Sequence, residues 1–503
     1  MSLPKTFLAG GSIAAMLLAA VPPGGVAGAE SIAPGAVVAG HIESGQGAFR
    51  HLQALQDIAS ANGGNRAAGS PGYDRSAEYV AQRLKEAGYI VRFEEFEFPF
   101  FEDRTPPVLV TSRPEGAPEN AADAVRTLTN SGSGDVTARL RAVGLGLGAE
   151  PPAVSHSGCE TADFKDFERG AVALIRRGTC PFQTKVENAA AAGAVGAVIM
   201  NEGTAGRTVA FSGLLSKPAA IPVVGVSYEH GRSLDIAARS DGAATVRLAV
   251  DAVSGKRTTR NVLAEMASAG DGPLILVGAH LDSVPEGPGI NDNGSGSAAV
   301  LEAALRLAPE MAQLPDQARG RVRFAFWGAE ERGLVGSRHH VGALSEEERR
   351  NIALYINLDM VGSPNFARFV QGSAAAGDGL ATVARSALAA DFREHGLPFE
   401  ERSGGRFGTD DASFSEKGIP TVGLYTGAGG PKSEAQAGLF GGAAGRPYDP
   451  CYHRACDTIE NIDREVLEEN TRALLRALDA VTIAPRGPGT PSPKPGELSE
   501  PKR

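Results

Sequence analysis

Five side chains that can bind zinc lie in order along this sequence: His280, Asp292, Glu331, Asp359 and His453. They stand in the strings GAHLDS, GINDNGSG, WGAEERG, INLDMVGS and CYHRACD. Two imidazoles and three carboxylates can hold two zinc ions when one carboxylate is shared between them. A zinc pair about 3.5–4 Å apart activates a water and stabilises the oxyanion of peptide hydrolysis. The sequence therefore predicts a metal-dependent hydrolase.

Three further residues stand beside these ligands. Asp282 follows His280 by two residues, where its carboxylate could accept the second ring N–H and fix the tautomer. Adjacent glutamates after an apolar strand indicate a metal or a cation nearby, and Glu330, next to Glu331, is the candidate general base. Tyr452, next to the last ligand, is a candidate donor to the oxyanion.

Three ligands follow apolar runs that are typical of buried parallel strands. The runs LILVGA, VRFAFW and IALYINL precede His280, Glu331 and Asp359. Each residue alone has an ordinary alternative, such as a loop histidine or a solvated charged turn. However, ligands of open α/β sheets bind beyond the carboxyl ends of the strands, and three such ends carry candidate ligands here.

Apolar strand-like runs alternate with amphipathic segments, which predicts an α/β fold: a mixed, largely parallel central sheet with helices on both faces. We expect helices over 47–61, 76–87, 295–308, 374–389 and 465–483, and strands over 90–98, 274–279, 322–327, 352–358 and 421–425. The pattern of apolar residues changes over roughly 130–250. Expected strands at 171–175, 195–200 and 221–226 and an expected helix at 185–192 indicate a small inserted α/β domain there.

The N-terminus has the features of a secretory signal. Lys5 precedes an apolar run over 7–20, and Ala27-Gly28-Ala29 fits the small-x-small cleavage pattern, so the mature chain would begin at Glu30. An uncleaved anchor is the alternative, although the run is short for a membrane span. No cysteine follows the apolar run, which argues against a lipid anchor. We expect a secreted protein without membrane association after cleavage.

The four cysteines fall into two local pairs, Cys159 with Cys180 and Cys451 with Cys456. Spacing and an exported location favour two disulfides. The second would fix a tight loop around His453. The net charge of −10 argues against nucleic acid as a partner.

Long stretches of this chain resemble a known family. The strings NRAAGSPGYDRSAEYVAQRLKEAGY and GLYTGAGGPKSEAQAGLFGGAAGRPYDPCYHRACDTIENID resemble secreted bacterial co-catalytic di-zinc aminopeptidases of the leucyl aminopeptidase type. The stretch GCETADFKDFERGAVALIRRGTCPFQTKVENAAAAGAVGAVIMN resembles a protease-associated domain. These resemblances imply a zinc exopeptidase fold, and we expect five segments: a signal peptide (1–29), two parts of a peptidase domain (30–129 and 253–484), a protease-associated insert (130–252) and a disordered tail (485–503).

The resemblance also implies roles for the site residues. It places His280 and either Glu331 or Asp359 on separate zincs, with Asp292 bridging and His453 completing the set. It implies Glu330 as general base, Tyr452 as oxyanion donor, and a substrate amino terminus held by carboxylates that include Glu330 and Asp359. Two Zn²⁺ per chain and peptides with a free N-terminus are therefore the expected cofactors and substrates.

One string departs from the family pattern. Many relatives carry Arg-Ser-Asp followed by His or Tyr, whereas this chain reads GGRFGTDDASF. Arg406, the candidate substrate-binding residue, is displaced by two residues from Thr409-Asp410, and Asp411 stands where an aromatic residue or histidine is frequent. Extra acidity at Asp411 could favour substrates with basic side chains.

Several alternatives stay open at this point. A carboxypeptidase or a glutaminyl cyclase could use a similar scaffold, and a non-catalytic peptidase-like binding module is a third alternative. A structural Ca²⁺ is a further candidate cofactor, and His/carboxylate sites accept metals other than zinc. We expect a monomer. The sequence leaves the preferred N-terminal residue open.

Overall fold

The computed structural model describes residues 46–112, 125–147, 155–204, 206–239, 244–266, 272–314, 320–372, 379–403 and 408–482. The expected signal peptide and the C-terminal tail lie outside the described residues. No described helix is long and apolar enough to span a bilayer.

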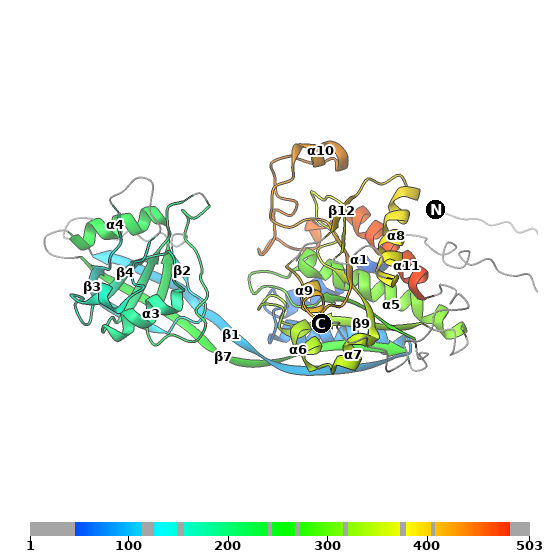
Figure 1. Ribbon diagram of the computed structural model, residues 1–503, viewed down its shortest axis with the longest axis horizontal. Helices are drawn as coiled ribbons and strands as arrows, with labels where there is room; N and C mark the ends of the chain where they lie inside the picture. The colour runs from blue at the N-terminus through cyan, green and yellow to red at the C-terminus, as the bar shows by residue number, and fades with distance from the viewer. Residues whose placement is uncertain are drawn as a thin grey trace, which may run out of the picture. The chain divides into compact units, whose positions relative to one another are not determined.

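The centre of the fold is a mixed, largely parallel sheet (Figure 1). Its strands run in the order β12-β11-β13-β10-β8-β9-β7, and β1 pairs with β7. The central strands β13, β10, β8 and β9 are parallel, and antiparallel pairing occurs at β11/β13, β7/β9 and β1/β7. The strands are β1 (Tyr89–Ser112), β7 (Thr245–Met266), β8 (Leu274–His280), β9 (Arg321–Trp327), β10 (Ile352–Leu358), β11 (Phe369–Gly372), β12 (Glu400–Ser403) and β13 (Thr421–Tyr425).

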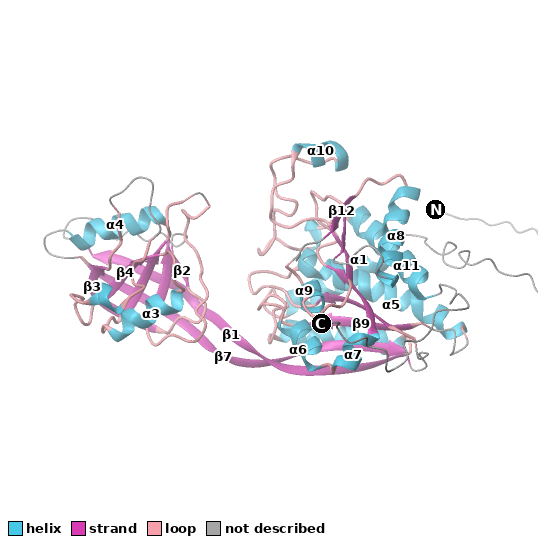
Figure 2. Cartoon of the chain, in the orientation of Figure 1, coloured by secondary structure: helices cyan, strands magenta, loops and turns pink. Residues whose placement is uncertain are grey.

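Alternate residues of the central strands enter two different cores, one on each face of this sheet. Ile275 and Val277 of β8 pack into the larger core, whereas Leu274 and Leu276 pack into the smaller one. Burial on both faces explains why these strands read as continuous apolar runs. Figure 2 shows the helices around the sheet, and the predicted α/β fold with helices on both faces is confirmed.

Five helices contribute to the larger core, and two contribute to the smaller one. The first set is α1 (Gln46–Ala61), α2 (Pro71–Glu86), α5 (Gly296–Gln313), α8 (Gly379–Glu394) and α11 (Arg464–Thr482); the second is α6 (Val335–Ala343) and α9 (Asp411–Ser415). The short helices α7 (Glu346–Asn351) and α10 (Glu434–Phe440) begin at capping boxes. Helix α2 begins five residues before the expected position, because Ser70 caps Tyr73 N and Pro71 occupies the first turn.

A long two-stranded ribbon connects the central sheet with the insert. Strands β1 and β7 pair antiparallel from Tyr89↔Met266 to Ser112↔Thr245, with two register shifts near Thr105 (Figure 1). The sequence predicted only 90–98 of β1, since the charged and proline-containing continuation lacks strict alternation. Beyond the ribbon, β3 pairs with β7 and leads into a second set of parallel strands.

The insert has its own layered structure. Strands β4 and β5 are buried on both faces, with α4 packing on one face and α3 on the other. A disulfide joins Cys159 to Cys180, as the spacing predicted. The elements are β2 (Val125–Thr127), β3 (Gly134–Ala142), β4 (Val172–Arg176), α3 (Phe182–Ala191), β5 (Gly196–Met200), β6 (Val223–Val226) and α4 (Tyr228–Arg239).

Candidate metal centre

The five predicted ligands come together at one edge of the sheet. His280 ends β8, and Glu331 and Asp359 follow β9 and β10. Asp292 lies in the kinked segment Ile290–Ser295 that leads into α5, where its own backbone is not helical. His453 lies in the loop between the second pair of cysteines. Parallel neighbouring strands end at the same edge, which is why three separate sequence segments meet here.

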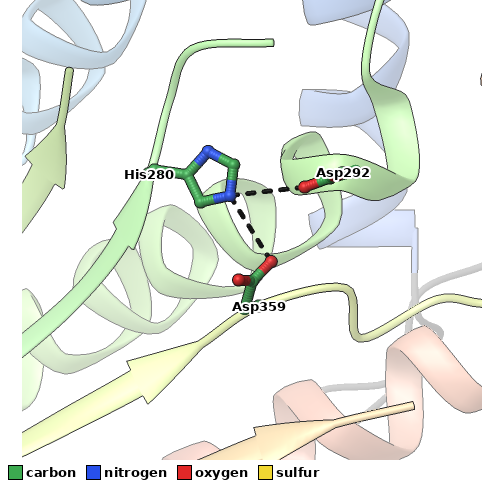
Figure 3. A group of neighbouring side chains, drawn as sticks. All are labelled: His280, Asp292 and Asp359. Atoms are coloured by element: carbon green, nitrogen blue, oxygen red, sulfur yellow. Dashed lines mark ion pairs between the residues drawn. The ribbon is translucent and has the colours of Figure 1, made fainter. Parts of the chain in front are cut away.

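Asp292 is the shared member of two groups of ligand atoms. Its Oδ1 lies 3.3 Å from His280 Nε2, which also lies 3.5 Å from Asp359 Oδ1 (Figure 3). Its Oδ2 lies 3.1 Å from His453 Nε2, which lies 3.2 Å from Glu331 Oε2. Within each group, all ligand atoms lie within 4.8 Å of one another. The geometry therefore groups Asp359 with His280, and Glu331 with His453.

The chemistry of these residues fits a pair of divalent cations. Asp292 is 5% exposed and His280 is 1% exposed, so these two ligands are largely shielded from water. Glu331 Oε1 and Asp359 Oδ1 find no hydrogen-bond donor in suitable geometry among the described residues. Burial raises the pKa of Glu331 to about 7. Buried carboxylates without donors are costly unless a cation offsets their charge, and zinc accepts this mixture of imidazole and carboxylate ligands.

Glu330 lies beside the group formed by His280, Asp292 and Asp359. Its Oε2 is 3.9 Å from His280 Nε2. Burial raises the pKa of Glu330 well above its ordinary value.

Tyr452 stacks on His453, with 3.9 Å between ring centroids. Burial and the nearby charge of Asp292 raise the pKa of the Tyr452 phenol well above its usual range. The phenol therefore keeps its proton and can donate a hydrogen bond.

The expected contact between Asp282 and His280 differs in the structure. The Nδ1–H of His280 donates to the backbone carbonyl of Asp282 at 3.1 Å, whereas the Asp282 carboxylate is 3.8 Å away. That carboxylate instead accepts the backbone N–H groups of Glu330 at 3.0 Å and Glu331 at 3.4 Å. The backbone carbonyl of Asp282 fixes the tautomer of His280, and the Asp282 carboxylate holds the turn that carries Glu330 and Glu331.

Two buried residues that the sequence did not single out hold the ligand segments. The Arg66 guanidinium donates to the carbonyls of Pro288 at 2.9 Å and Gly289 at 2.5 Å and to that of Leu281. The backbone N–H of Arg66 donates to Ser283 Oγ at 2.9 Å. Arg66 therefore ties together the segments that follow His280 and precede Asp292. Its string, NRAAGSPG, was visible, but no spacing rule predicts carbonyl partners so far along the chain.

Asp457 also holds the segment that carries Asp292. Its carboxylate accepts the backbone N–H groups of Asn291 at 2.9 Å and Asp292 at 3.0 Å. The Asn291 side chain in turn donates to Asp449 at 2.7 Å. Asp449 and Asp457 stand on either side of the histidine loop, so the segments that carry Asp292 and His453 are linked through buried hydrogen bonds.

The backbone is strained at His453 and close to Glu331 and Asp359. Ala329, Met360 and His453 have φ values of 58°, 51° and 56°. Such left-handed conformations cost about 1–3 kcal/mol each for side chains other than glycine, and they persist where the surroundings hold them. The disulfide between Cys451 and Cys456 closes the loop that contains His453, which agrees with the predicted pairing.

Two more carboxyl groups lie next to this centre. Asp410 and Asp411 are 1% and 4% exposed, and burial raises the pKa of each to about 7. Arg406 lies outside the described residues.

Comparison with known proteins places these features in a family. The model of peptidase family M28 matches residues 261–478, and the PA domain model matches residues 140–234. The PA match lies inside the insert expected at 130–252; the domain limits themselves stay a prediction.

The chain is 43% identical over 433 residues to an aminopeptidase of Pseudomonas aeruginosa, covering 84% of this chain and 78% of the relative. It is 38% identical over 449 residues to a probable lipoprotein aminopeptidase of Mycobacterium tuberculosis, covering 84% and 81%. Among solved structures, the aminopeptidase from Aneurinibacillus sp. strain AM-1 has a TM-score of 0.62 at 27% identity, covering 87% of this chain and 94% of that one. A zinc aminopeptidase from Bacillus subtilis has a TM-score of 0.60 at 26% identity, covering 86% and 94%.

The fold and the metal-binding edge thus define a metallo-exopeptidase of the α/β class. This chain belongs to peptidase family M28 and carries a PA domain. The predicted aminopeptidase with a protease-associated insert is confirmed.

Proposed function

We propose that this chain is a secreted, monomeric di-zinc aminopeptidase that removes residues from the free amino terminus of extracellular peptides. The observation that carries the proposal is the division of five ligands into two groups that share Asp292, with Glu330 beside His280. The peptidase parts are 30–129 and 253–484, and the insert is 130–252. Ca²⁺ is not needed for this mechanism.

His280, Asp292 and Asp359 would hold one zinc, and Asp292, Glu331 and His453 would hold the other. When bound, the zinc pair would polarise the scissile carbonyl and lower the pKa of the attacking water.

The protein's own groups then move the proton and stabilise charge. The Glu330 carboxylate accepts a proton from the attacking water and passes it to the leaving amine. The Tyr452 hydroxyl donates to the oxyanion. The carboxylates of Glu330 and Asp359 attract the ammonium of the substrate, so an acetylated amino terminus would bind poorly.

The test combines metal content with activity. The mature chain is purified, zinc is counted, and Leu-p-nitroanilide is compared with its N-acetylated form. We expect two zincs per chain and cleavage of the free-amine substrate only. Glu330→Gln should keep both zincs and lose about 10²- to 10⁴-fold in kcat.

The matched control is Glu347→Gln, because Glu347 is exposed on α7, and it should behave as the parent does. One zinc per chain, or cleavage of the acetylated substrate, would contradict the proposal. Two zincs without anilide cleavage would favour a carboxypeptidase or a cyclase, and a chain without metal would favour a binding module. Detection of the protein in culture medium, with an N-terminus at Glu30, tests secretion.

A further inference from the structure

The segment that carries the bridging ligand is bonded to the segment that follows β10. Asn293 is next to Asp292 in the sequence and is fully buried. Its side-chain amide donates to the carbonyl of Leu358 at 2.9 Å, and its side-chain oxygen accepts the backbone N–H of Met360 at 3.2 Å. Leu358 and Met360 are the two neighbours of Asp359 in the sequence. One side chain therefore holds the backbone on both sides of a predicted zinc ligand.

Two more side chains of this segment extend the contact. The side-chain oxygen of Asn291 accepts the N–H of Gly362 at 3.2 Å, and Ser295 Oγ accepts the N–H of Val361 at 2.9 Å. Both side chains are fully buried. The polar residues at alternate positions of the string NDNGS thus accept three consecutive backbone N–H groups that follow Asp359. Buried N–H groups need such acceptors, so the two segments are matched to each other.

Met360, which directly follows Asp359, depends on this support. Its φ is 51°, a left-handed conformation that a residue with a side chain keeps only where the surroundings hold it. Asn293 accepts the N–H of this residue, so the amide helps to hold the turn. The turn in turn sets the direction in which the Asp359 side chain leaves the sheet.

The ligand group that lacks Asp359 has a separate support. Asp457 accepts the N–H of the bridging Asp292 at 3.0 Å. The Asn293 side chain takes no part in that bond, so its loss should disturb the zinc that is held with Asp359 and spare the other.

We propose that Asn293 is a positioning residue that fixes Asp359 relative to Asp292 and thereby sets the affinity for one zinc of the pair. This inference rests on the proposed di-zinc function and adds a residue to it. Side chains that hold metal ligands in place commonly contribute about 10- to 100-fold to metal affinity.

Two single-site backgrounds separate the zincs. In His453→Ala the remaining zinc is the one held with Asp359, and in Asp359→Ala it is the one held with His453. Zinc affinity is measured in each full-length chain by competition with a chromogenic chelator. Adding Asn293→Ala should weaken zinc binding by about 10- to 100-fold in the first background and leave it within about 3-fold, below the range for such side chains, in the second.

Asn201→Ala is the matched control. Asn201 is 2% exposed, its amide donates to the carbonyl of Val209 at 2.8 Å, and its side-chain oxygen accepts the N–H of Glu202 at 2.9 Å. It therefore resembles Asn293 in burial and in its bonds to backbone, but its partners belong to the insert. Both zinc affinities should stay at the values of their backgrounds.

The outcomes separate this inference from the proposed function. A loss in both backgrounds, a loss in Asp359→Ala alone, or no loss in either overturns the positioning role of Asn293 while the di-zinc aminopeptidase stands. A parent chain that binds fewer than two zincs overturns both.

Ser295→Ala is a second variant, in case Asn293→Ala fails to fold, which circular dichroism of the metal-free protein shows. It removes the acceptor of the Val361 N–H and should weaken zinc binding by about 10-fold in the His453→Ala background. In Asp359→Ala the affinity should not change. An equal effect in both backgrounds, or an effect in neither, contradicts the matching of the two segments.

Discussion

Replacing Arg66 with methionine is the sharpest test of how the ligand segments are held. Arg66 is fully buried, and its guanidinium donates to the carbonyls of Leu281, Pro288 and Gly289. In Arg66→Met these three acceptors lose their donor in a place without water. Each buried unsatisfied polar group costs about 1–3 kcal/mol, and the buried methionine side chain contributes about 1.5–3 kcal/mol in return.

The net loss in the free energy of unfolding should be about 3–5 kcal/mol, which is the sum for three acceptors less the apolar contribution. Because the entropy of unfolding grows with chain length, a chain of this size loses roughly 1–2 °C per kcal/mol, so the melting temperature should fall by about 3–10 °C. The assay is thermal unfolding followed by circular dichroism, on protein stripped of metal by a chelator, so that zinc does not contribute.

Arg75→Met is the matched control, since Arg75 is 67% exposed on α2 and pairs only with the neighbouring Glu78 among the described residues. Exposed pairs of this kind contribute about 0–1 kcal/mol, so little change is expected. Arg66→Lys should recover part of the loss, because lysine keeps the charge and can still donate. A fall of less than about 1 °C in Arg66→Met, which corresponds to about 1 kcal/mol or less, would refute the reasoning.

Three more predictions concern the supporting groups. Asp457→Asn should weaken zinc binding by about 10- to 100-fold, because the amide loses the charge that holds two backbone N–H groups of the bridging segment; competition with a chromogenic chelator measures this. Cys451→Ser should lower zinc occupancy from two toward one, since it opens the histidine loop, and occupancy that stays at two would contradict that role. The third prediction concerns Asp479, whose pKa is raised to about 7 by burial and by the neighbouring Glu310. Since an unfolded Asp has a pKa near 4, the charged form of Asp479 destabilises the fold increasingly as pH rises from about 4 to 7. Asp479→Asn should therefore raise the free energy of unfolding at pH 8 by about 1–2 kcal/mol, after allowance for its partial exposure, and by less at pH 5; denaturant unfolding at the two pH values measures this.

The parts of the fold that could be predicted are those with a local signal. The strand expected at 352–358 has those bounds in the structure, because an uninterrupted apolar run requires a central strand. The far half of β1 could not be found, since its order comes from pairing with β7 and not from its own pattern.

The same division holds for the site. Three candidate ligands stood out because they follow apolar runs, Asp292 because it lies in a glycine-rich string and His453 because it lies between two cysteines. The structure brings all five together. Arg66 and Asp457 were missed because their partners are backbone groups that only the tertiary fold brings near. The sequence suggested that the Asp282 carboxylate accepts the ring N–H of His280. In the structure it accepts the N–H groups of Glu330 and Glu331, because β8 and β9 are neighbouring strands.

The ribbon of β1 and β7 has a consequence for the order in which the chain folds during synthesis. The edge of the peptidase sheet contains one strand made before the insert and one made after it. While the ribosome is still making the insert, β1 has no partner, whereas β3 to β6 already have one another. Domains generally fold as units from the N-terminal side during synthesis. The PA domain therefore acquires its structure first, and the catalytic sheet closes only when β7, β8 and β9 have emerged.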